Sequence, residues 1–151
     1  MRPVDPGGTH LWLVLMKAHR ALARHASKSV GQFDIGLSDF AILEVLLHKG
    51  PLPVNDIGRR IELTSGSISS AVDRLEARGL VRRAADAADR RARIVHLTAP
   101  GKACIQPIFA SHKQAMDDAA RGLSGAERAT LIDLLKKLGT FADADAHEKK
   151  D

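Results

Sequence analysis

Aromatic residues and cysteine are scarce in this sequence of 151 residues. It holds four phenylalanines, one tryptophan and no tyrosine, so a core built from its hydrophobic fraction of 44% must be largely aliphatic. The single cysteine, Cys104, excludes an intramolecular disulfide and suits a reducing compartment. The length suffices for one domain, or for one domain with an added oligomerisation element.

Long hydrophobic runs are also missing. The longest run near the start, Leu11 to Met16, is too short to span a bilayer, and no pattern of a cleavable signal follows it. We therefore expect a cytoplasmic protein without a membrane partner. The net charge of +5 and the isoelectric point near 9.7 fit a polyanionic partner, although a basic domain with no such partner has the same composition.

Motifs of catalysis and metal binding are absent as well. The sequence has no glycine-rich phosphate loop, no nucleophile elbow, no HExxH motif and no clear carboxylate pair, so we expect no enzymatic activity. Its seven histidines are scattered, and no two of them show a tight spacing such as i, i+4 with a carboxylate or cysteine beside it, as is typical of metal ligands. We therefore expect neither a metal site nor a cofactor.

The order of helical and strand-like patterns indicates the fold class. Apolar stripes and helix breakers predict helices over about 11–30, 38–49, 54–61, 65–78, 99–121 and 125–142. The segments "GLVRR" and "RARIVHLT" predict two short strands with a polar tip between them. A helix–turn–helix followed by a hairpin is a winged helix. We therefore predict a mainly α fold with a small β-hairpin wing and additional helices for dimerisation.

Capping signals mark several of the predicted helix ends. Ser38 and Thr64 suit helix N-caps, because a hydroxyl can accept a hydrogen bond from an otherwise unpaired amide. Thr98 can cap the long helix that follows it, and "SGAE" at 124–127 has the form of a capping box. Gly79 fits the left-handed position behind the helix that begins after Thr64.

The helix after Thr64 has the small, hydroxylic surface that a DNA groove accepts. Its inward stripe is aliphatic and consists of Ile68, Ala71, Val72 and Leu75. The serines between these positions then face outward, where hydroxyls can bond to phosphates or base edges and small side chains allow close approach. A serine-rich helix start that only caps itself is the alternative interpretation.

The predicted hairpin is rich in arginine. Five arginines lie between positions 82 and 93, against Asp86 and Asp89. Arginine at a hairpin tip can enter a narrow minor groove, and Asp89 can orient one through an ion pair. A solvated run of charge is the alternative. The helix and the hairpin together provide the candidate DNA-binding residues Thr64, Ser65, Ser67, Ser69, Ser70, Asp73, Arg74, Arg83, Asp89, Arg90 and Arg91.

These features in combination resemble the MarR family of winged-helix repressors. The segments "AVDRLEARGLVRR", "DRRARIVHLT" and "LSGAERATLIDLLKKLG" carry the resemblance, which covers residues 10–142. It implies a homodimer in which each winged domain binds half of a pseudo-palindromic site on double-stranded DNA. It places the groove-contacting positions within 65–74 and the wing motif of the family on Asp89 and Arg91. Such proteins usually repress a nearby operon and release DNA when a small effector binds.

The resemblance also implies a division of the chain. The N-terminal helix and the last two helices would form the base of the dimer, and the segment between them would bind DNA. We therefore expect a flexible arm over 1–9, a dimerisation region over 10–34 and 99–142, a winged helix-turn-helix domain over 35–98 and a disordered tail over 143–151.

A narrower resemblance concerns the effector. The segments "LSDFAILEVLLHKGPLPVNDIG", "LTSGSIS" and "IFASHKQAM" resemble the subgroup that responds to quinones and hydroquinones. The family pocket is lined by the first, second and fifth helices, and a phenol or quinone needs apolar walls with one or two polar groups. The candidate effector-binding residues are Trp12, Met16, His19, Phe40, Leu43, Phe109, His112 and Met116. For each of them, ordinary core or interface packing is the alternative.

Three other functions are compatible with the same patterns. Some members of the family sense oxidants through one cysteine, which makes Cys104 a candidate redox site, although Ala103 and Ile105 flank it and buried packing is equally compatible. A non-specific architectural protein would share the fold and would lose nearly all affinity for DNA with salt. A winged-helix module for protein binding would direct the arginines toward an acidic protein surface.

Overall fold

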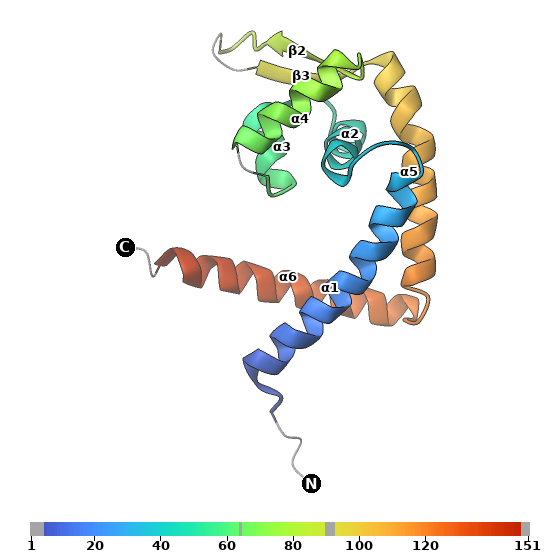
Figure 1. Ribbon diagram of the computed structural model, residues 1–151. Helices are drawn as coiled ribbons and strands as arrows, with labels where there is room; N and C mark the ends of the chain where they lie inside the picture. Colours follow the sequence, from blue (N-terminus) through green and yellow to red (C-terminus); the bar gives the residue numbers. More distant parts are fainter. Residues whose placement is uncertain (1–4, 64, 90–92, 149–151) are drawn as a thin grey trace. The chain divides into compact units, whose positions relative to one another are not determined.

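The computed structural model describes residues 5–63, 65–89 and 93–148, and within these ranges it holds six α-helices and three β-strands (Figure 1). The prediction of a mainly α fold with a small β-hairpin is confirmed, and the hairpin belongs to a three-stranded antiparallel sheet. The chain divides into two compact units, Met1–Met116 and Asp117–Asp151. None of the helices in the described ranges is long and apolar enough to cross a membrane.

The first unit contains the sheet and most of the helices. Its elements are α1 (Gly7–Gly31), α2 (Leu37–Lys49), β1 (Leu52–Pro53), α3 (Val54–Arg60), α4 (Ser65–Ala77), β2 (Val81–Ala85), β3 (Arg93–Leu97) and most of α5 (Ala99–Ala119). Helix α4 packs against α2, α3 and β2 (Figure 1). The second unit contains α6 (Gly125–Glu148).

The sheet has the strand order β1-β3-β2 and is antiparallel throughout. Strands β2 and β3 form the predicted hairpin, with Val81 opposite Leu97 and Arg83 opposite Val95. Strand β1 was not predicted, because two residues are too few to show an alternating pattern. Proline is tolerated there since β1 lies at the edge of the sheet, where its missing N–H leaves no ladder bond unmade.

The core of the first unit is aliphatic, as the scarcity of aromatics predicts. Among the described residues, Phe40 is the one aromatic side chain in the buried set. Val30 of α1 and Ile105 of α5 are fully buried in the same cluster as Ile42 of α2 and Leu75 of α4. This shared cluster holds the helix–turn–helix against the ends of α1 and α5 and so determines how α4 is presented.

Several helix ends lie where the capping signals predict them. The amide of Gly101 donates to Thr98 Oγ1 at 3.0 Å, and Ser124 and Glu127 exchange the two hydrogen bonds of a capping box at 2.8 and 3.2 Å. Gly79 has a φ of 72°, and Leu80 donates its amide to the carbonyl of Leu75. This bond and the left-handed glycine are those of a Schellman motif, which explains why the end of α4 needs glycine at this position.

Three predicted boundaries are wrong. Helix α2 begins at Leu37 with Gly36 as its N-cap, so Ser38 is inside the helix and its side chain makes no cap. Helix α1 begins at Gly7, whose amide donates to Asp5 Oδ1 at 3.2 Å, so part of the predicted arm is helical. Helix α6 continues to Glu148, because after Gly139 the sequence contains no helix breaker before that point. The predicted cap Thr64 lies outside the described residues.

Candidate nucleic-acid interface

Helix α4 has one fully buried face and one exposed serine face. Ile68 is 1% exposed, and Ala71, Val72 and Leu75 are completely buried, which confirms the predicted inward stripe. Ser67, Ser69 and Ser70 are exposed on the outer side of the helix. Because the two faces follow from the helical period, the same contacts that anchor α4 in the core present its hydroxyls to the outside.

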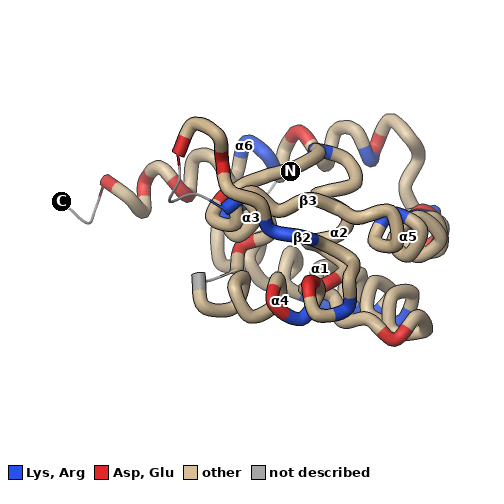
Figure 2. The backbone as a smooth tube through the Cα atoms, turned by 90° about the horizontal axis from the view of Figure 1, so that it is seen from above, with Lys and Arg blue, Asp and Glu red and all other residues tan. Residues whose placement is uncertain are grey.

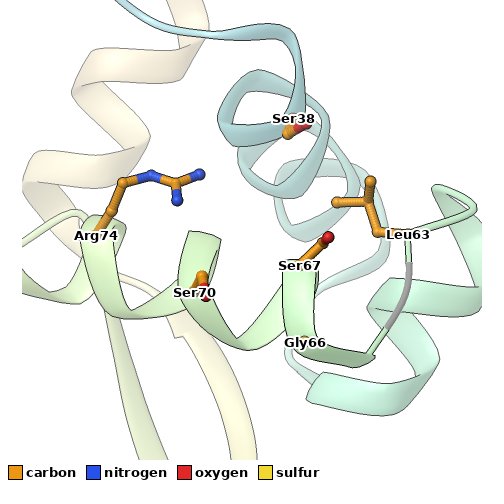
Figure 3. Close-up of a pocket in the computed structure, with 6 residues that line it drawn as sticks. All are labelled: Ser38, Leu63, Gly66, Ser67, Ser70 and Arg74. Carbon is orange, nitrogen blue, oxygen red and sulfur yellow. The ribbon is translucent and has the colours of Figure 1, made fainter.

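A hollow of about 370 Å³ lies between the starts of α2 and α4 (Figure 3). Ser38 lines it from α2, and Gly66, Ser67, Ser70 and Arg74 line it from α4, together with Leu63. Hydroxyl and guanidinium groups are among those that bond to phosphate oxygens in protein–DNA complexes. Ser38, which was wrongly predicted to be an N-cap, therefore belongs to this polar hollow. The sequence did not indicate the hollow.

Arg74 is oriented by an ion pair with Asp39. Its Nη2 donates to Asp39 Oδ1 at 2.8 Å, and the Asp39 side chain is only 12% exposed, whereas that of Arg74 is 56% exposed. The hydrogen bond that Arg74 donates to this carboxylate, followed by the negative charge of Asp39, raises the pKa of Arg74 above its ordinary value. The guanidinium therefore stays charged and is held at the edge of the hollow.

Arg83, a predicted DNA-binding residue, has its guanidinium against α4. Its Nη2 lies 2.8 Å from Asp73 Oδ1, and its Nη1 lies 3.1 Å from Glu76 Oε1. The physical reason is the period of the strand: Arg83 shares a face with the buried Val81, and this face packs on α4. Arg82 is exposed on the opposite face of the strand. The same alternation, read from the sequence, would have indicated that Arg82 and not Arg83 is the exposed arginine of this pair.

The tip of the wing is described only in part. Arg90 and Arg91 lie outside the described residues, as does Thr64, and for Ser65 only its place at the start of α4 is described. Asp89 is exposed at the end of the described part of the tip. Asp86 Oδ1 accepts a hydrogen bond of 3.0 Å from the amide of Ala88. This bond forms a local turn just after β2.

The predicted effector residues are distributed over α1, α2 and α5. The ring of His112 lies 4.8 Å from that of Phe40, and its Nδ1 is 3.1 Å from Ser29 Oγ at the end of α1. Phe109 contacts His48, with ring centroids 4.6 Å apart. Leu43 is completely buried, Met16 and Met116 are half-buried, and Trp12 and His19 are exposed.

Cys104, the candidate redox site, lies among hydrophobic side chains. Cys104 is half-buried and packs against the hydrophobic core of the first unit, one residue before the completely buried Ile105. Phe109 packs against the same core from the following turns of α5.

A helix–turn–helix with an exposed serine face, followed by an arginine-rich hairpin, defines a winged-helix DNA-binding protein. Comparison with known proteins specifies the family. The model of the MarR family matches residues 33–92. The HTH-type transcriptional regulator MhqR of Bacillus subtilis (strain 168) is 36% identical over 132 residues, which cover 87% of this chain and 91% of the relative. The chain belongs to the MarR family and is a DNA-binding transcriptional regulator.

Two solved structures support the fold. A mutant of E. coli MarR in complex with operator DNA has a TM-score of 0.78 at 22% identity, covering 90% of this chain and 98% of that chain. BpsR of Bordetella bronchiseptica, whose DNA binding is regulated by 6-hydroxynicotinic acid, has a TM-score of 0.76 at 24% identity and covers 92% of this chain and 97% of its own.

Proposed function

We propose that this regulator is a sequence-specific repressor that binds a pseudo-palindromic operator as a homodimer. The observation that carries the proposal is the serine face of α4 above a completely buried aliphatic stripe. In helix–turn–helix proteins the second helix lies in the major groove, and a rigid helix with small outward side chains fits that position. Asp89 and Arg91 of the wing would then lie near the adjacent minor groove.

The proposal of a homodimer rests on apolar side chains that a single chain leaves exposed. On α1 these include Leu11, Trp12 and Val14, with Trp12 59% exposed, and on α6 they include Leu134 and Phe141, with Phe141 74% exposed. Large apolar side chains exposed along each of these helices favour a protein partner. A second copy of the chain is the simplest partner, because a two-fold dimer also matches a pseudo-palindromic site.

We further propose a small aromatic effector, either a phenol or a quinone, that binds near His112. The hydroxyl of Ser29 donates to the carbonyl of Ala26 at 2.9 Å, so in its contact with His112 this oxygen accepts from Nδ1–H. A neutral His112 then has Nε2 left as an acceptor, which suits the O–H of a phenol or hydroquinone. Phe40 provides an aromatic wall beside the imidazole.

The proposed operator binding is tested by fluorescence anisotropy with the DNA upstream of the protein's own gene. A scrambled duplex of equal length and composition is the control, at about physiological salt. We expect a preference of ~10³-fold or more for the upstream DNA. Equal, weak and salt-sensitive affinity for both duplexes would instead identify an architectural protein.

The proposed effector class is tested on the same complex. Phenols, hydroquinones and quinones are titrated into the protein–operator complex, and release is followed by the fall in anisotropy. We expect release by hydroquinones, and we expect His112→Phe to weaken it because Phe removes the acceptor nitrogen but preserves ring packing. A response of this variant equal to that of the parent would exclude His112 from the effector site.

A further inference from the structure

Helix α4 carries more negative than positive charge, although the proposed function brings it against DNA. Within Ser65–Ala77 one arginine stands against one aspartate and one glutamate, so the helix has a net charge of −1. The arginine is Arg74, whose charge is already paired with Asp39 of α2. The carboxylates of Asp73 and Glu76 are 68% and 41% exposed. Phosphates repel such carboxylates, so DNA binding by α4 requires a neighbouring cation to offset them.

Arg83 of β2 is placed to offset both carboxylates. Its guanidinium pairs with Asp73 at 2.8 Å and with Glu76 at 3.1 Å. The backbone N–H of Arg83 donates to Glu76 Oε2 at 2.7 Å, so an amide on this edge strand is satisfied by α4 and not by another strand. Figure 2 shows the basic segment of β2 beside α4.

The same contacts withdraw Arg83 from direct interaction with DNA. Its side chain is only 22% exposed, and Nη2 also lies 3.5 Å from the carbonyl of Ser69. A guanidinium in this position has its donors directed at α4, with few left for phosphate oxygens. Arg82, which precedes it in the chain, is exposed and makes a matched comparison.

We propose that Arg83 is a positioning residue that offsets the charges of Asp73 and Glu76, so that α4 can approach DNA, and that it does not contact DNA itself. This inference rests on the proposed function, because it concerns the approach of α4 to the operator. The inference also gives Asp73 and Glu76 a part in DNA binding, because their charges determine how much Arg83 matters.

The proposal is tested by a double-mutant cycle in the full-length protein. The affinity for the upstream duplex is measured at about 50 mM salt, where charges are weakly screened. Arg83→Gln should weaken binding about tenfold in the parent, within the range of coupled neighbours. In the Asp73→Asn/Glu76→Gln background the same substitution should cost less than about twofold, because no carboxylate is left to offset.

Arg82→Gln is the matched control, since it removes the same charge from the same strand. Its cost should be equal in the parent and in the Asp73→Asn/Glu76→Gln background. The proposal is overturned if Arg83→Gln costs as much in that background as in the parent, because this is the behaviour of a direct phosphate contact. Arg83→Lys should retain most of the affinity, and a loss as large as that of Arg83→Gln would also contradict the proposal.

A measurement without DNA separates this inference from the proposed function. Hydrogen exchange of the Arg83 backbone amide should become faster in Glu76→Ala, because the carboxylate accepts from that amide. An unchanged exchange rate would show that the contact between Glu76 and Arg83 is not maintained, and would overturn the inference alone. If the parent binds neither the upstream nor the scrambled duplex, the proposed function fails, and the role of Arg83 in DNA binding fails with it.

Discussion

Asp39, in the first turn of α2, accepts a hydrogen bond of 2.8 Å from the guanidinium of Arg74 in α4. The pair joins α2, which precedes the helix–turn–helix of α3 and α4, to α4, which carries the serine face. Arg74 lines the hollow with Ser38 and Ser70, so its orientation affects the surface that we propose for DNA (Figure 3). An arginine fixed in this way loses less conformational entropy on binding than a free one.

Asp39→Ala should therefore reduce specificity more than affinity. Arg74 keeps its charge but loses its orientation, and the protein loses one negative charge, so binding to unrelated DNA should strengthen. We expect the ratio of operator affinity to unrelated-DNA affinity to fall about tenfold, as for coupled neighbouring groups. Anisotropy titrations on both duplexes measure this ratio. Glu44→Ala removes the same charge from the same helix, and a similar fall for this control would contradict the role of Asp39.

Gly101→Ala should destabilise the protein strongly. A Cβ at this position would lie 1.9 Å from the carbonyl oxygen of Leu80 and 2.9 Å from Leu97 Cδ1, so α5 or the backbone at Leu80, just before β2, would have to shift. We expect the free energy of unfolding to fall by about 2–3 kcal/mol, as for other overpacked sites. Urea denaturation followed by circular dichroism measures it. Gly8→Ala is the control, because nothing lies within 4 Å of a Cβ there, and a loss of similar size would point to a general effect of alanine.

Ser70→Glu should abolish operator binding without unfolding the protein. The side chain is exposed on α4 and lines the hollow, so a carboxylate there would repel phosphates at close range. Ser27→Glu makes the same change of charge at an exposed position of α1 and should bind like the parent. Electrophoretic mobility shift and thermal unfolding are measured on both variants. Normal binding by Ser70→Glu would show that the serine face of α4 is not the DNA-contacting surface.

Trp12 makes the proposed dimer measurable, because it is the single tryptophan of the sequence. It is 59% exposed in one chain, so its fluorescence should shift to shorter wavelength as two copies associate. Leu134→Glu places a charge on the exposed apolar side of α6 and should yield monomers with red-shifted emission. Light scattering after size exclusion gives the mass.

Lys136→Glu is the control for this dimer prediction, since it changes the charge of α6 by a larger amount, on the side of the helix opposite Leu134 and Phe141. This variant should remain dimeric. Monomeric parent protein at micromolar concentration, or a stable dimer of Leu134→Glu, would contradict the proposed dimer surface.

Features governed by contacts between near neighbours in the chain could be predicted from the sequence. The buried stripe from Ile68 to Leu75 follows from the helical period, and the capping bonds of Thr98, Ser124 and Glu127 follow from residues three positions apart. The Schellman motif at Gly79 is equally local. These signals were sufficient for the order of the helices and of the hairpin strands β2 and β3, and for the outward serine face of α4, but they did not reveal β1.

The partners of the charged side chains depended on contacts between distant segments. Arg74 meets Asp39 across 35 positions, and Arg83 meets Asp73 across ten, because α4 packs against both α2 and β2. Strand alternation places Arg83 on the inner face, but only the packing of β2 on α4 brings it to two carboxylates. Periodicity determines which face of an element a residue occupies, whereas the crossing of elements determines which side chains that face meets.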